Sequence, residues 1–278
     1  KEQPLVSVII PNKDHTEDLD KCIRSIEEKG TYKNIEYIVI ENNSQKKETF
    51  AYYEKLQAEN PKVKVVFWER EFNYSAINNY GVGFAKGEYL LFLNNDTEII
   101  NPDCIEELLG YCMRDDVGIV GARLYYEDDT IQHVGVIIGL GGVAGHTFVG
   151  EPKDSLGYFG RIVTAQDYSA VTAACLMTKR KVFEKVNGFE EKLAVAFNDV
   201  DFCLKVREAG YLVVYNPYAE LHHYESKSRG LEDTEEKVLR FQGEIRTFQY
   251  RWKEILNEGD PYYSPNLTLD KTDFSLRI

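Results

Sequence analysis

The first half of the chain alternates between short apolar runs and longer amphipathic stretches. The apolar runs at residues 5–11, 35–44, 63–69, 88–96 and 117–124 have the length and composition of buried strands. Between them, residues 16–30, 46–60, 75–87 and 102–115 carry apolar side chains at helical spacing, the first with a Thr16 cap and Gly30 at its end. Repeated strand–helix units predict an α/β fold with a mostly parallel, doubly wound sheet.

The regular alternation ends after residue 124. The next residues are typical of a hairpin that runs into a glycine-rich segment, residues 139–150, which we expect to be a mobile loop or a long turn. Residues 168–190 predict a strand, a helix and a turn, followed by a helix at 198–210 and a strand at 211–217. A charged helix at 234–256 precedes a tail rich in Pro, Tyr and Asn, and no repeat or linker divides the chain.

Polar residues follow three of the first four predicted strands, at Pro11–Asp14, Glu41–Ser44 and Asn94–Asp96. The carboxyl ends of parallel strands lie at one edge of a sheet, so these three clusters should converge. Each cluster alone is more typical of a turn than of a site. Three clusters in register indicate a ligand site.

The predicted site lacks the signatures of other nucleotide-binding folds. The turn after the first strand reads IPNKDHTEDL and has no glycine, which excludes a GxGxxG fingerprint, and no GxxxxGK[ST] loop is present. Acceptor oxygens at strand ends suit the N–H and O–H groups of a base and a ribose. A terminal carboxylate, Asp96, suits a divalent cation that bridges a diphosphate.

Charge and composition narrow the classes of partner. The formal net charge of the 278 residues is −13, which argues against nucleic-acid binding and favours a metal cation as the mediator of an anionic ligand. The five cysteines form no CxxC pair and are typical of reduced, mostly buried thiols in a cytoplasmic protein. No apolar run approaches the about 18 residues of a membrane span, and no signal peptide is present. The chain opens on Lys1, which is typical of a piece of a longer protein.

Five stretches, in this order, resemble family 2 glycosyltransferases of the GT-A fold: VSVIIPNKDHTEDLDKCIRSI, YIVIENNS, EFNYSAINNYGVGFAKGEYLLFLNNDTEI, NDVDFCLKVREAGY and HHYESKSRG. The similarity is greatest to bacterial members that build rhamnose-containing or other cell-surface polysaccharides. It implies one domain at residues 1–230, with a nucleotide-binding half at about 1–121 and an acceptor or catalytic half at about 122–230. Residues 231–278 would be a helix and tail packed on that domain.

The resemblance also assigns a nucleotide-binding set: Pro11, Asn12, Asp14, Glu41, Asn43, Asn73, Asn78, Asn94, Asn95 and Asp96. Glu41 stands where an Asp is more usual. The Asn94-Asn95-Asp96 sequence occupies the DxD position and keeps only the last carboxylate. Asp96 is therefore expected to be the main contact of a Mn²⁺ or Mg²⁺ ion, with Asn94 nearer the sugar or ribose.

The remaining metal ligands are expected from the diphosphate, water and a distant side chain. In AELHHYESKSRG, His222 and His223 are adjacent and point to opposite sides of an extended segment, and the resemblance favours His223. The alternative is that both histidines lie on the surface. Lys227 and Arg229 suit a loop that closes on a diphosphate, although such a pair is also typical of a solvated surface.

The stretch FNDVDFC resembles the acidic ED-type motif of the family. Asp199 and Asp201 are two residues apart at a helix start, so they do not share a face, and either also suits the helix dipole. The resemblance implies that Asp199 is the general base and that Asp201 is structural. A sugar hydroxyl is a poor nucleophile, so direct displacement at the anomeric carbon needs a base and inverts the configuration.

The resemblance therefore implies an inverting, metal-dependent glycosyltransferase that moves a sugar from a UDP- or dTDP-linked donor to a glycan or lipid-linked acceptor. Such an enzyme is expected in the cytoplasm or at the inner face of the membrane, held there by its acceptor or by a flanking region. A catalytically silent sugar-nucleotide module is the alternative, because the first DxD carboxylate is missing. A phosphohydrolase is disfavoured, because one Asp and one His are too few for a two-metal centre. Donor sugar, acceptor, linkage and oligomeric state are not specified.

Overall fold

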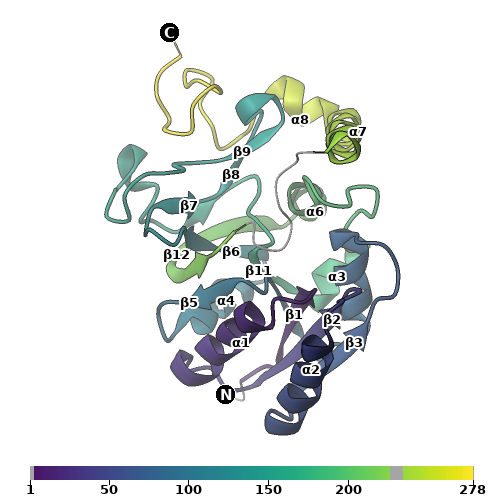
Figure 1. Ribbon diagram of the computed structural model, residues 1–278. Helices are drawn as coiled ribbons and strands as arrows, with labels where there is room; N and C mark the ends of the chain where they lie inside the picture. The colour runs from purple at the N-terminus through teal and green to yellow at the C-terminus, as the bar shows by residue number, and fades with distance from the viewer. Residues whose placement is uncertain (1–2, 226–233, 278) are drawn as a thin grey trace.

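The computed structural model describes residues 3–225 and 234–277 (Figure 1). Within them, ten strands form one sheet in the order β10-β12-β6-β11-β4-β1-β2-β3, with β5 paired to β12 and β7 to β6, and β8 and β9 form a separate ribbon. The strands are β1 (Val6–Asn12), β2 (Ile35–Glu41), β3 (Val63–Phe67), β4 (Tyr89–Leu93), β5 (Thr97–Ile99), β6 (Val117–Tyr125), β7 (Ile131–His133), β8 (Val136–Ile138), β9 (Ala144–His146), β10 (Gln166–Asp167), β11 (Cys175–Lys179) and β12 (Leu212–His223).

The helices cover both faces of the sheet, as predicted. They are α1 (Thr16–Arg24), α2 (Lys47–Glu59), α3 (Tyr74–Val82), α4 (Cys104–Cys112), α5 (Arg180–Lys185), α6 (Asn198–Glu208), α7 (Glu235–Arg251) and α8 (Lys253–Glu258), with short turns η1 (Ser25–Lys29), η2 (Leu140–Gly142) and η3 (Tyr158–Gly160). Side chains alternate along β1, so Val8 packs with α1, α2 and α4 while Ile9 packs with α3, α5 and α6. All five cysteines are buried and free.

The sheet is mixed, which the regular strand–helix alternation did not reveal. Strands β4, β1, β2 and β3 run parallel, and so do β6 and β12. Strand β11 lies between β4 and β6 and is antiparallel to both. This arrangement joins the two predicted halves of the domain in one continuous sheet.

Three details of the predicted helices are wrong for local reasons. Thr16 is not a cap: α1 begins at Thr16 after a left-handed His15 (φ 44°), which makes no capping hydrogen bond. Helix α3 ends at Val82 rather than near residue 87, because the backbone tightens into bonds such as Gly83 N–H to the Tyr80 carbonyl. The predicted C-terminal helix is divided into α7 and α8 at Trp252, whose φ of −107° is not helical.

The glycine-rich segment is pinned by the C-terminal tail. The carboxylate of Asp260 accepts a hydrogen bond from Ile138 N–H at 2.7 Å, and Phe148 N–H donates to the Thr272 carbonyl at 2.8 Å. The rings of Phe148 and Phe274 stack with centroids 4.8 Å apart. Figure 1 shows this tail beside β8 and β9, far from the N-terminus. The tail thus packs against the glycine-rich segment, which is held by contacts along its length.

Strand β12 is longer than the predicted 211–217 strand and reaches His223. A register shift between Asn216 and Glu220 accommodates Pro217, which lacks an N–H for the ladder. Beyond this shift, β12 pairs with β5, with His223 opposite Thr97. The long strand therefore carries the two histidines to the turn that contains Asp96.

Candidate active site

The three polar clusters predicted to converge do meet at one edge of the sheet. Asn95 Nδ2 donates to Asn12 Oδ1 at 2.6 Å, and Asn12 Nδ2 donates to the Tyr53 hydroxyl at 2.7 Å. The Tyr53 hydroxyl donates to Glu41 Oε2 at 2.7 Å, and the same oxygen accepts from Ser44 Oγ at 2.6 Å. One hydrogen-bonded chain therefore links β4, β1, α2 and β2; we call these five residues the nucleotide side.

The two acids of this region are largely satisfied from inside the protein. Glu41 is 2% exposed and accepts three hydrogen bonds, two from Ser44 and one from Tyr53. A carboxylate has about four acceptor positions, so about one is left for a ligand. This geometry makes Glu41 first of all an organiser of the loop, and direct contact with a nucleotide stays a prediction.

Asp14 fixes the start of α2. Its carboxylate accepts from the N–H groups of Gln45 and Lys46 at 3.2 and 3.1 Å and from Thr49 Oγ1 at 2.8 Å. Burial alone would raise the pKa of Asp14, but these hydrogen bonds outweigh it and the pKa is lowered. The φ of 50° at Asp14 makes the sharp turn that aims its side chain at α2. Asp14 thus joins β1 to α2 beside the nucleotide side.

The other predicted nucleotide contacts are more dispersed. Pro11 is partly exposed at the end of β1, and Asn43 donates to the Arg70 carbonyl at 2.7 Å. Asn73 caps α3 by accepting from Ala76 N–H at 2.9 Å, and buried Asn78 donates to the Tyr74 carbonyl at 2.9 Å. Across the described ranges, no hydrogen bond joins Asn73 or Asn78 to the nucleotide side.

Asp96 and His223 come together from distant parts of the sequence. Asp96 lies in the turn between β4 and β5, and its carbonyl accepts from Tyr224 N–H at 2.9 Å. His223 Nε2 is 3.2 Å from Asp96 Oδ1 and 3.1 Å from Asn94 Nδ2. His222 points the other way, toward Asp129 at 2.9 Å. His223, and not His222, is therefore the histidine that lies beside Asp96, and its role as a metal ligand stays a prediction.

The donor set suits a divalent cation. Ligand atoms about 2.0–2.2 Å from one ion, placed at right angles, lie about 3 Å apart, which is close to the 3.2 Å between Asp96 Oδ1 and His223 Nε2. No cluster of three or more His, Cys, Asp or Glu side chains suited to a metal occurs in the part of the chain that is described. The protein therefore offers two ligands, and a nucleotide and water would have to supply the others. We call Asn94, Asp96 and His223 the metal side.

Asp199 lies in the first turn of α6 and is partly exposed. Its Oδ2 accepts from Ala173 N–H at 3.1 Å and its Oδ1 from Val200 N–H at 2.9 Å, so the carboxylate plane is fixed. Tyr74 on α3 is close to both acids: burial, and then the negative charges of Asp199 and Asp96, raise the pKa of its hydroxyl. Asp199 and Asp96 thus both lie close enough to Tyr74 for their charges to act on its hydroxyl.

Asp201 faces away from this region, as the spacing predicted. Its side chain is fully buried, and Oδ1 accepts from Trp252 Nε1 at 2.9 Å and lies 3.2 Å from Arg251 Nε. Lys205 Nζ is 3.6 Å from Oδ2. Burial raises the pKa of Asp201 despite these cations. Asp201 therefore attaches α6 to α7. The two other predicted contacts, Lys227 and Arg229, lie outside the described residues.

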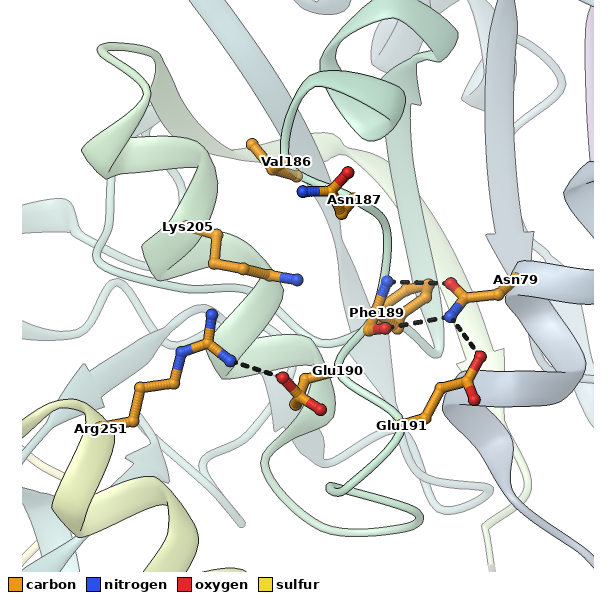
Figure 2. A pocket seen from close by; sticks show the side chains of 8 residues that line it. All are labelled: Asn79, Val186, Asn187, Phe189, Glu190, Glu191, Lys205 and Arg251. Atoms are coloured by element: carbon orange, nitrogen blue, oxygen red, sulfur yellow. Dashed lines mark hydrogen bonds and ion pairs between the residues drawn. The ribbon is translucent and has the colours of Figure 1, made fainter.

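A separate polar hollow of about 430 Å³ lies between α3, the segment after α5, α6 and α7 (Figure 2). Its charged groups are paired: Arg251 contacts Glu190 at 2.8 Å, and Asn79 donates to Glu191 at 3.2 Å. Lys205 points into it and donates to the Gly188 carbonyl. None of the candidate site residues that the structure describes lines this hollow.

Four residues of the site region escaped the sequence analysis as individual candidates. Tyr53 and Tyr74 were hidden among apolar positions of two helices, and Ser44 was grouped with a turn. Gln132 contacts His223 Nδ1 at 2.7 Å through its side-chain oxygen. A buried polar residue inside an apolar strand pattern was the available signal for Gln132.

The comparisons with known proteins agree with the fold. Residues 7–186, well over half of the chain, match the description Glycosyl transferase family 2. Two solved structures share the fold at 16% identity: GalNAc-T7 with UDP, GalNAc and Mn²⁺ (TM-score 0.72, 91% of this chain and 49% of that one), and mannosyltransferase PcManGT of Pyrobaculum calidifontis with GDP-Man and Mn²⁺ (0.64, 92% and 69%). The architecture is that of the GT-A glycosyltransferases, and the chain belongs to glycosyltransferase family 2.

Two curated relatives match almost the whole chain. "Uncharacterized protein y4gI" of Sinorhizobium fredii is 48% identical over 98% of this chain, and "O-antigen biosynthesis protein RfbC" of Myxococcus xanthus is 38% identical over 99%. This chain spans 30% of the first and 21% of the second. The matched region is thus less than a third of either relative. No helix in the described ranges is both long and apolar enough to cross a membrane.

Proposed function

We propose that the chain transfers a sugar from a UDP- or dTDP-linked donor to a glycan or lipid-linked acceptor in cell-surface polysaccharide synthesis, with inversion and with a divalent cation. The observation that carries the proposal is the 3.2 Å approach of Asp96 Oδ1 to His223 Nε2, two metal-ligand types brought together at the edge where the nucleotide side converges. The O-antigen relative and the family support the polysaccharide role.

Each group of residues has a distinct task in this proposal. Asp96 and His223 would hold Mn²⁺ or Mg²⁺, which would neutralise charge on the departing nucleoside diphosphate. Asn12 and Asn95, held together by the hydrogen bond from Asn95 Nδ2 to Asn12 Oδ1, would position the nucleobase and ribose. Asp199 would accept the proton of the acceptor hydroxyl as that oxygen bonds to the anomeric carbon. Its two backbone hydrogen bonds orient the carboxylate and leave further lone pairs for that proton.

The metal assignment is tested by binding of UDP with and without EDTA. UDP should bind at least ten-fold more weakly in EDTA than with Mn²⁺. The Asp96→Ala variant should bind UDP as weakly with Mn²⁺ as the wild type does in EDTA. His222→Ala is the matched control, because His222 faces Asp129 instead of Asp96. Equal UDP affinity with Mn²⁺ and with EDTA would contradict the assignment.

The identity of the nucleobase in the donor is a finer proposal. One structural neighbour holds GDP-Man and the other UDP, so the fold by itself does not select the nucleobase. The acceptor position left on Glu41 suits a pyrimidine N3–H or a ribose hydroxyl, and we expect UDP and dTDP to bind more tightly than GDP. Competition among the three nucleotides tests this, and tighter binding of GDP would reassign the donor.

A second candidate function is a sugar-nucleotide-binding module without catalysis. It is favoured by one observation: Asp96 is the sole carboxylate of the Asn94-Asn95-Asp96 turn. The rate at which the protein slowly hydrolyses the sugar donor, measured with and without Mn²⁺, distinguishes the transferase from the non-catalytic module. Metal-dependent hydrolysis that is lost in Asp199→Asn supports the transferase, and binding without any hydrolysis supports the module.

A further inference from the structure

Gln132 lies behind His223, on the side away from Asp96. It belongs to β7, which pairs with β6 so that Ile131 is opposite Tyr125 and His133 opposite Leu124. Gln132 is the extra residue at this register shift, and such bulges re-aim side chains next to active sites. Gln132 is 4% exposed and His223 is 8% exposed, so both side chains are held in place.

The contacts of Gln132 fix the orientation of its amide. Its Nε2 has two acceptors, the His223 carbonyl at 3.2 Å and Glu225 Oε2 at 3.3 Å. These oxygens cannot donate, so the nitrogen must face them and Oε1 must face the imidazole. Oε1 is 2.7 Å from His223 Nδ1. An amide oxygen only accepts, so Nδ1 must carry a hydrogen.

The tautomer of His223 follows from this contact. In a neutral imidazole one nitrogen donates and the other accepts, so Nε2 carries the lone pair. Asn94 Nδ2, a donor, lies 3.1 Å from Nε2, which agrees with this assignment. The lone pair of Nε2 is then directed to the region that it shares with Asp96 Oδ1, 3.2 Å away.

We infer that Gln132 is a positioning residue that holds His223 in the Nδ1–H tautomer and thereby presents Nε2 as a ligand atom toward Asp96. The metal part of this inference rests on the proposed function, whereas the tautomer does not. Second-sphere groups that orient a ligand histidine typically change metal affinity by about 10- to 100-fold when replaced. Without Gln132, an Nε2–H tautomer would donate to Asp96 and block the shared position.

The tautomer is tested first, in metal-free protein. Ring ¹⁵N NMR at mildly alkaline pH distinguishes the two tautomers, and the His223 signal is identified by its loss in His223→Ala. We expect the Nδ1–H form in the wild type and a shift to Nε2–H in Gln132→Met, whereas Gln132→Glu retains an acceptor and the Nδ1–H form. An Nε2–H wild type, or a Gln132→Met protein with unchanged tautomer, would overturn the inference.

Mn²⁺ affinity in the presence of UDP is the second measurement. Gln132→Met should bind Mn²⁺ about 10- to 100-fold more weakly, and Gln166→Met, the same change on β10 where the amide donates to the Arg161 carbonyl, should not. If Gln132→Met does not fold, the Gln132→Asn variant is measured in its place, because the shorter side chain cannot reach His223 Nδ1. Wild-type affinity in a folded variant would overturn the inference. A wild type that binds no Mn²⁺ contradicts the proposed function instead, and the NMR result then decides the role of Gln132.

Discussion

The acidic residues around the carboxyl edge of the sheet divide into supporting carboxylates and site carboxylates. The supporting carboxylates, Asp14, Glu41 and Asp201, each take several contacts from other parts of the chain and tie two elements together. The site carboxylates, Asp96 and Asp199, which we propose to act in the reaction, lie near Tyr74, and Asp96 faces His223. Acidic residues of one chain thus differ in the contacts that hold their carboxylates. Substitution should affect stability in the first group and chemistry in the second.

The largest effect is expected at Asp199. Asp199→Asn keeps the shape but removes proton acceptance, so transfer should fall by about 100- to 10,000-fold. UDP affinity should stay unchanged, and the urea midpoint should fall only slightly, because one of the two oxygens that accept backbone N–H groups becomes a donor at a partly exposed position. Steady-state transfer assays measure the loss of turnover, and nucleotide titration measures the UDP affinity. Near-normal turnover would place the base elsewhere and break the division between the two groups.

The largest stability effect is expected at Asp201. Asp201→Ala leaves Lys205 and Arg251 without their shared counter-charge, and removing one partner of a buried ion pair costs about 3–5 kcal/mol. Arg251 also contacts Glu190, so the lower end of that range is expected. Urea unfolding measures the loss, and transfer per folded molecule should be preserved. Intact stability with lost transfer would move Asp201 into the site group.

A smaller effect is expected at Glu41. Glu41→Gln replaces one acceptor oxygen by a donor that faces Ser44 or Tyr53, and an unpaired buried polar group costs about 1–3 kcal/mol. Tyr53→Phe is the control, because it removes one of the three contacts and leaves the carboxylate. We expect both stability and UDP affinity to fall in Glu41→Gln. A loss of affinity at full stability would make Glu41 a direct nucleotide contact.

The smallest effect concerns Glu98, which anchors the turn of Asp96 to α1 and η1. Burial alone would raise its pKa, but hydrogen bonds from Lys29, Lys21 and Tyr224 lower it from 4.5 to about 2. Ionised Glu98 therefore makes its full contribution to the free energy of unfolding above pH 4.5, and that contribution is lost as the pH falls toward 2. Both lysines are nearly half exposed, so the contribution stays below about 1 kcal/mol. Glu98→Gln should lower stability at neutral pH only; a difference that persists at pH 2 contradicts this ion-pair origin.

Much of the site could be predicted because strand ends impose simple geometry. Parallel pairing of β1, β2 and β4 brought Asn12, Glu41 and Asn95 to one edge, and alternation along β12 separated His222 from His223. The contact between Gln132 and His223 could not be predicted, because it depends on a single register shift in β7.

Other features required tertiary information. Strand β11 lies between β4 and β6 and runs antiparallel to both. Its sequence has no pattern that distinguishes it from a parallel strand. The hydrogen bonds that occupy Glu41 come from Ser44 in the adjacent loop and from Tyr53, whose ring position on α2 is set by packing. Residue type therefore located the acidic residues in the sequence. Only their surroundings in the structure distinguish the supporting carboxylates from the site carboxylates.

The hold of the C-terminal tail on the β8–β9 ribbon has a consequence for synthesis on the ribosome. Ile138 is bonded to Asp260, which is made 122 residues later. At about 5–20 residues per second, roughly 6–24 s separate the two. During that interval the Ile138 N–H lacks the carboxylate that accepts from it, next to the apolar Val136 and Ile137, which are buried in the folded protein. The nascent chain thus passes through a period of exposure to aggregation that ends only after Asp260 has emerged.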